Sequence, residues 1–199
     1  MGSRTHGPRS FDAVVVGQRE TDAWVAYYRH EWVAFLRASV AMVAAGFGMR
    51  PADTLRGAWL VLRANQAWAP FPDNDPHRAR ALMCRFYALV LATGGLDLDP
   101  TRAAVLEVEW WRVHREHQHD GAVTNEQLVG ALVDLYAYVY AADPDHVRPA
   151  AARRVEAMDL SDAWVRGGCS PADPLLAAER RALVASYAAL LDAVGRSGV

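Results

Sequence analysis

Apolar residues recur at intervals of three and four positions along most of this 199-residue chain, starting at about Thr21. This interval is the period of an α-helix, and proline or glycine separates one periodic segment from the next. No segment alternates apolar and polar residues for long enough to indicate a β-sheet. The pattern therefore predicts an all-α protein.

The same pattern gives the boundaries of the expected helices, and local signals support two of the starts. Asp99 is followed by proline at the first helical position, and Thr124 can form a capping box with Gln127. Helices are expected over about residues 21–47, 53–69, 76–93, 99–119, 124–142, 145–165 and 174–194. We expect a single-domain bundle of six or seven helices, in which the third and fifth, apolar on nearly all sides, lie in the middle.

Residues 1–20 lack the helical period and are expected to form a flexible arm in front of a helical domain over residues 21–195. The segment DAVVVG, residues 12–17, imitates the first strand of a dinucleotide-binding fold. QRE follows it, however, where GxxG would be needed to admit a pyrophosphate. We therefore expect no cofactor.

Composition and charge narrow the classes of function. The formal net charge is −2 with both signs interspersed, so we expect no binding to nucleic acid and no basic patch for a membrane. All 21 basic residues are arginine. Without lysine the chain cannot form a Schiff base with pyridoxal phosphate or a carbonyl substrate, and it lacks the lysine of a phosphate-binding loop.

The cysteines and the longest uncharged segment indicate where in the cell the protein is located. Cys84 and Cys169 form neither a CxxC pair nor a disulfide framework. The uncharged segment ASVAMVAAGFGM, which begins at Ala38, is too short to cross a bilayer, and no signal-peptide core is found near the N-terminus. We therefore expect a soluble, cytoplasmic protein.

The segment EVEWWRVHREHQHD, which begins at Glu107, concentrates acids and histidines around two tryptophans. In the helix expected here, Val105 and Val113 belong to the apolar face, and Glu109 lies four positions from each. The carboxylate of Glu109 is therefore predicted to point inward. Glu107 is predicted to lie on another side of the helix.

The same segment contains two spacings that can place metal ligands on one side of a helix: HxxH at His114 and His117, and ExxH at Glu116 and His119. A metal site would need further ligands from elsewhere, and a ferritin-like di-iron site would need Glu-x-x-His on a second helix, which is missing. Histidines at the end of a helix are also favoured by its dipole. We expect a solvated helix end and no metal.

Other helices are also predicted to turn polar residues inward. Glu31 falls among aromatic residues of the first helix. Gln66 shares the apolar face of the second helix, with Asn65 at the edge of that face. Arg85 lies among alanine and leucine residues of the third helix, and Asp162 continues an apolar stripe of the sixth.

Burying such groups costs several kcal/mol unless they are paired or neutralised, so each needs a partner. In one interpretation Arg85 pairs with Glu31 or Glu109, and the polar residues form a structural network that fixes the order of the helices. In the other, Glu31, Gln66, Arg85 and Glu109 line one cavity. The aromatic rim of that cavity would be Trp24, Tyr28, Trp59 and Trp110.

A cavity of this kind predicts proton-transfer chemistry. One desolvated glutamate would have a raised pKa and deliver a proton, while the other, beside Arg85, would stay ionised and act as a base. Gln66 and Asn65 would orient a carbonyl or hydroxyl group of the substrate. Tyr136 and Tyr140 fit either a core or a ligand site.

Three hypotheses of function follow. In the first, the protein is an enzyme that isomerises, dehydrates or cyclises an apolar or aromatic small molecule, with Glu31 and Glu109 as the catalytic residues. In the second, it is a non-enzymatic ligand-binding or interaction protein whose helices form a homodimer. In the third, it is a metal-dependent oxidase or oxygenase that uses the carboxylates and the histidine patch.

Overall fold

The computed structural model describes residues 7–94 and 96–196, and in this part of the chain it contains α-helices and no β-strand, as predicted. Eight helices are described, one more than the largest number expected. Their bounds are α1 Ala13–Tyr28, α2 Trp32–Phe47, α3 Pro51–Trp68, α4 Pro76–Thr93, α5 Pro100–His119, α6 Asn125–Tyr140, α7 Pro144–Arg166 and α8 Pro174–Arg196.

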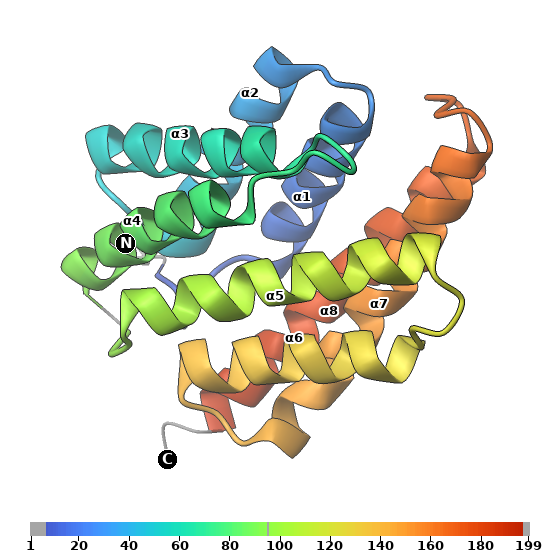
Figure 1. Ribbon diagram of the computed structural model, residues 1–199. Helices are drawn as coiled ribbons and strands as arrows, with labels where there is room; N and C mark the ends of the chain where they lie inside the picture. The colour runs from blue at the N-terminus through green and yellow to red at the C-terminus, as the bar shows by residue number, and fades with distance from the viewer. Residues whose placement is uncertain (1–6, 95, 197–199) are drawn as a thin grey trace.

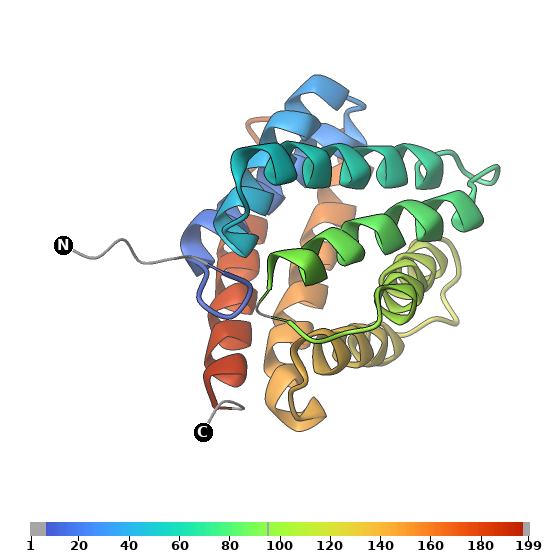
Figure 2. The ribbon, with the colours of Figure 1, turned by 90° about the vertical axis from the view of Figure 1, so that its left-hand side faces the viewer.

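The helices form a closed ring in the order of the chain (Figures 1 and 2). Each helix packs against the one that precedes it and the one that follows it, and α8 packs against α1. The prediction that residues 76–93 and 124–142 would form the middle of a bundle is wrong, because α4 and α6 are members of the ring like the others. The ring surrounds a common centre.

The extra helix arises because the segment expected as one helix over residues 21–47 is divided into α1 and α2. The division lies at Arg29–Glu31, where His30 adopts a left-handed backbone with φ 58°. A left-handed residue cannot continue a right-handed helix, so the direction of the chain changes here. The apolar residues on the two sides of the break therefore follow two separate helical faces.

The expected arm is also corrected, because α1 begins inside it. The Asp12 side chain accepts hydrogen bonds from the backbone amides of Val14 and Val15 and so caps the helix. Phe11 is buried, and Gly17 lies so close to α8 that an added Cβ would be 2.8 Å from the backbone of Val184. Residues 1–6 lie outside the described residues.

Helix starts that have a local signal agree with the prediction. The side chain of Asp99 accepts a hydrogen bond from the amide of Thr101 at 2.9 Å, and Thr124 and Gln127 form the expected capping box. The sixth expected segment, for which the pattern gave residues 145–165, is the unbroken helix α7 and contains Pro149.

None of the helices in the described residues is both long and apolar enough to span a membrane.

Candidate functional site

The centre of the ring holds a cavity of about 200 Å³. Its walls are mostly apolar and aromatic, and every one of the eight helices contributes at least one side chain. Glu20 of α1, Glu107 of α5 and Arg154 of α7 are the charged residues in the lining. A cavity with apolar walls and a few polar groups is the usual form of a small-molecule site.

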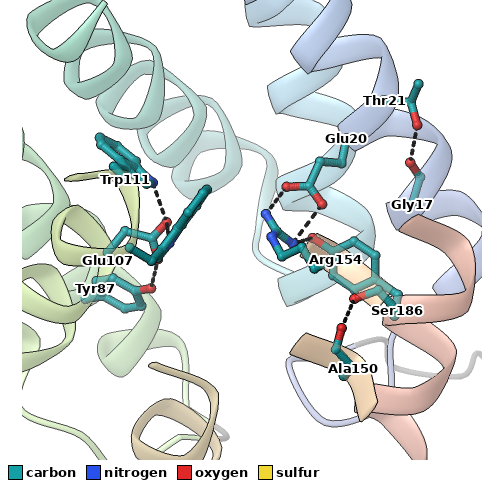
Figure 3. A network of polar contacts seen from close by, with 11 residues as sticks. Gly17, Glu20, Thr21, Tyr87, Glu107, Trp111, Ala150, Arg154 and Ser186 are labelled. Carbon is teal, nitrogen blue, oxygen red and sulfur yellow. Dashed lines mark hydrogen bonds and ion pairs between the residues drawn. The ribbon is translucent and has the colours of Figure 1, made fainter. Parts of the chain in front are cut away.

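Glu107 is held in the cavity wall by three aromatic hydrogen-bond donors, of which Figure 3 labels Tyr87 and Trp111. The Tyr87 hydroxyl donates to Oε2 at 2.7 Å, and the indole N–H groups of Trp110 and Trp111 donate to Oε1 at 3.1 and 3.2 Å. Burial raises the pKa of the Glu107 carboxyl, while the Tyr87 hydrogen bond and the positive charge of Arg154 lower it in part. No arginine or histidine forms an ion pair with this carboxylate among the described residues.

Glu20 and Arg154 form a buried ion pair on the other side of the view in Figure 3. Nη1 of Arg154 donates to Oε2 of Glu20 at 3.0 Å, and Nη2 donates to Oε1, so the contact is bidentate. The guanidinium also lies over the rings of Trp24, Trp110 and Tyr187 at 5.3–5.9 Å from their centroids. Its charge is therefore largely satisfied by its own neighbours.

Three further tyrosines line the central cavity: Tyr136, Tyr140 and Tyr187. Nη1 of Arg154 donates to the Tyr187 hydroxyl at 3.4 Å. Burial raises the pKa of the Tyr136 hydroxyl, while the nearby charge of Arg154 and a side-chain interaction with it lower the pKa in part. Within the described residues this hydroxyl has no hydrogen bond of normal geometry, so it has capacity to bond with a ligand.

A second cavity of about 80 Å³ adjoins the first. The two share a wall formed by Trp24, Phe35, Asn65, Trp110 and Trp111. The rest of the second cavity is lined by residues near the ends of α1, α3 and α5, which are Tyr27, Tyr28, Trp68, His114, Arg115 and Gln118.

A buried hydrogen-bond network borders the second cavity. Asp162 of α7 accepts a hydrogen bond from Nε2 of Gln118 at 2.6 Å, and its other oxygen lies 3.3 Å from Nε2 of His114. Gln118 also donates to the Tyr28 hydroxyl at 3.0 Å. The inward position predicted for Asp162 is therefore confirmed.

Four residues predicted to bind substrate do line these cavities. Trp24, Asn65 and Trp110 contribute to both cavities, and Tyr28 contributes to the second. The amide of Asn65 donates to the backbone oxygen of Val61 at 3.0 Å, which fixes its orientation. The remaining predicted residues lie elsewhere.

The inward positions predicted for Glu31 and Glu109 are wrong. Glu31 is exposed in front of α2 and forms an ion pair with Arg29 at 2.7 Å, because the helix break changes the face on which it falls. Glu109 forms an ion pair with Arg112 at 2.7 Å, with 39% of its side chain exposed. Val105, which had defined the inward face of this helix, is itself 46% exposed.

Arg85, Gln66 and Trp59 do not join the cavities either. Arg85 is exposed on α4, so it pairs with neither Glu31 nor Glu109. Gln66 is half-buried and lines neither cavity. Trp59 is 51% exposed, and Arg63 lies over its ring. The structure therefore does not bring Glu31, Gln66, Arg85 and Glu109 together.

Glu107 is the inward acid that the sequence interpretation missed. It lies three positions from Ala104 and four from Trp111, both of which are buried. Ala104 was a usable signal, because small residues mark where neighbouring helices approach each other. The inward position of Glu20 is not predicted because Glu20 falls in the expected arm. The inward position of Arg154 is not predicted because no apolar face is assigned to it.

The histidine patch does not form a metal site in the described part of the chain. No group of three or more histidine, cysteine, aspartate or glutamate residues there could hold a metal ion. His114 faces Asp162, whereas His119 stacks on Phe71 with ring centroids 4.4 Å apart. The two histidines therefore have separate surroundings.

Comparison of this chain with protein-family models, with curated proteins and with solved structures found no match.

Proposed function

We propose that this protein is an enzyme that binds a small, mainly apolar or aromatic molecule in the central cavity and transfers a proton to or from it through Glu107. The reaction class is isomerisation, dehydration or cyclisation. The observation that carries the proposal is the position of Glu107: a carboxyl group in an apolar cavity wall, held by three donors and, within the described residues, in no ion pair.

The surroundings of Glu107 support a role in proton transfer rather than in stability alone. A carboxyl group with a raised pKa is a stronger base when ionised and is more readily protonated near neutral pH. The neutral donors Tyr87, Trp110 and Trp111 fix its orientation without neutralising its charge. General acid–base catalysis needs a group that is held in this way and has an adjusted pKa.

The other polar residues have separate roles in the proposal. In an isomerisation of a β,γ-unsaturated ketone, Glu107 takes a proton from the carbon between the carbonyl group and the C=C bond. The C–H electron pair forms a new C=C bond to the carbonyl carbon, and the C=O π pair moves to the oxygen, which accepts a hydrogen bond from the Tyr136 hydroxyl. When the C=O bond forms again, the new C=C bond shifts one carbon along, and the electron pair of the original C=C bond takes the proton back from Glu107 at the γ-carbon. Glu20 remains paired with Arg154 at the edge of the cavity and takes no part in the proton transfer.

The test uses the exchange of carbon-bound hydrogen in a panel of ketones that contain a benzene ring: 1-indanone, 2-tetralone and 4-phenyl-2-butanone. Proton NMR in D₂O should show that the protein accelerates exchange of the protons next to the carbonyl in at least one of them. Glu107→Gln should reduce that acceleration by about 100-fold or more, because the amide cannot carry the proton.

The matched control is Glu109→Gln, on the same helix but on its exposed side. It should leave the exchange rate unchanged. No acceleration by the wild-type protein, or equal rates for wild type and Glu107→Gln, would contradict the proposal.

A non-enzymatic ligand-binding or dimerising protein is the alternative, and one feature of the surface favours dimerisation. Leu55 and Trp59 of α3 lie four positions apart and are 59% and 51% exposed. Sedimentation of wild type and Trp59→Ala would show whether this face joins two copies.

A cytoplasmic location remains part of the proposal, based on the free thiols of Cys84 and Cys169.

A further inference from the structure

Arg115 lines the second cavity without a carboxylate to balance its charge. Its guanidinium lies over the rings of Trp68 and Phe71 at 5.6 and 5.3 Å, and Nη2 donates to the Tyr27 hydroxyl at 3.2 Å. No ion pair to this half-buried guanidinium occurs within the described residues. It differs in this from Arg154, whose charge is balanced by Glu20.

The nearest acidic network does not supply that missing partner. One carboxylate oxygen of Asp162 accepts a hydrogen bond from Gln118, and the other lies against Nε2 of His114. Both contacts hold the carboxylate behind the cavity wall. Asp162 is not among the residues that line the second cavity. The cavity itself therefore presents a positive charge among tyrosine, tryptophan and amide groups.

The shared wall connects this charge with the proposed reaction site. Trp110 and Trp111 border both cavities, and their indole nitrogens hold Glu107 on the side of the central cavity. Because the two cavities adjoin along these residues, a molecule whose apolar part lies in the central cavity can extend its end group towards Arg115. The second cavity, at about 80 Å³, has room for a small end group and not for a second ring system.

We propose that the second cavity binds the carboxylate of an apolar or aromatic carboxylic acid, with Arg115 as the binding residue. A guanidinium offers two parallel N–H donors that match the geometry of a carboxylate. A phosphate carries more negative charge than one arginine neutralises, so the carboxylate fits this site better. The inference rests on the proposed function and names its substrate class.

The test compares three acids with their own carboxamides: 2-naphthoate, 2-naphthylacetate and 4-phenylbutyrate. Binding is followed by tryptophan fluorescence, since Trp24, Trp68, Trp110 and Trp111 line the cavities, and by calorimetry. At least one acid should bind about tenfold or more tightly than its amide, as expected for one charge-assisted contact.

Variants then locate the contact. Arg115→Met keeps a flexible apolar side chain over the two aromatic rings and should remove the preference for the acid while changing amide binding less than about twofold. Arg115→Lys should retain part of the preference. The matched control is Arg63→Met, because Arg63 also lies over a tryptophan, Trp59, but lines neither cavity. It should leave the binding of both compounds unchanged.

The outcomes separate the two proposals. Equal affinity of the wild-type protein for acids and amides would overturn the assignment of Arg115 and leave the proposed function standing. An acid preference that survives Arg115→Met would also overturn it. If no acid and no amide binds, the assignment of Arg115 fails, and the proposed function is judged separately by the ketone exchange of wild type and Glu107→Gln.

Discussion

Glu107 and Glu179 are two carboxyl groups whose pKa values burial raises, yet their surroundings differ. Glu107 has three hydrogen-bond donors and lines the central cavity. Glu179 lies on α8 near Ser161 and Asp162 of α7, and neither of its oxygens has a hydrogen bond of normal geometry among the described residues. Its side chain is fully buried and lines neither of the two cavities.

The comparison separates a raised pKa from a functional site. Desolvation acts on both groups, and at Glu179 it raises the pKa to about 8, with the negative charge of Glu20 adding to the effect. At Glu107 the donors oppose it and fix the carboxyl towards a space that a molecule can occupy. A perturbed pKa indicates chemistry only where such a space exists.

The largest effect is expected from a variant that makes Glu20 as poorly partnered as Glu179. Arg154→Met removes both bonds to Glu20 and leaves a buried carboxylate unpaired, which should lower the free energy of unfolding by about 3–5 kcal/mol. The double variant Glu20→Gln with Arg154→Met should recover a large part of the loss. Urea unfolding at pH 7 measures both, and equal stability of single and double variants would contradict the expectation.

A smaller effect is expected from Glu179→Gln, which resembles the protonated acid. The folded-state pKa of Glu179, about 8, lies above the ordinary value of 4.5. The contribution of Glu179 to the free energy of unfolding is therefore fully present below pH 4.5 and is lost as the pH rises towards 8. The variant should therefore gain stability over wild type at pH 9, on the order of 3 kcal/mol, and show little difference at pH 5. Denaturant unfolding at both pH values tests this, and an equal difference at the two would refute it.

The smallest effect is expected from Tyr87→Phe, which makes Glu107 more like Glu179. The Tyr87 hydrogen bond lowers the pKa of the Glu107 carboxyl, so its removal should raise that pKa. The pH at which ketone exchange reaches half its maximum should move upward by up to about one unit. An unchanged or lower midpoint would show that Tyr87 does not act on the group that transfers the proton.

Features with a local cause were predictable from the sequence. The caps at Asp99 and Thr124 depend on residues within one helical turn, and both were placed correctly. The all-α class follows from the period of the apolar residues. For the inward acid on α5 the sequence offers one weaker signal, the small residue Ala104, because the face that is buried otherwise depends on which side meets neighbouring helices.

The error on α5 has a physical explanation. Val105 and Glu109 share one side of the helix, and an apolar residue such as Val105 predicts that this side is buried. The ring instead places α5 between α4 and α6, so its buried face runs through alanines and tryptophans and includes Glu107. Likewise, histidine is not a residue type that marks a helix break, so the sequence does not indicate the break at His30. Without that break, Glu31 is assigned to the wrong face of the helix.

The contact between α1 and α8 has a consequence for how the molecule folds. The other seven contacts of the ring join helices that follow one another in the chain, whereas this one joins residues such as Arg180 and Gln18, 162 positions apart. Closing so long a loop has a high entropic cost and is expected late in folding. Arg154 meets Glu20 of α1 and Tyr187 of α8 across this junction, so the charged wall of the cavity is complete only when the ring is closed.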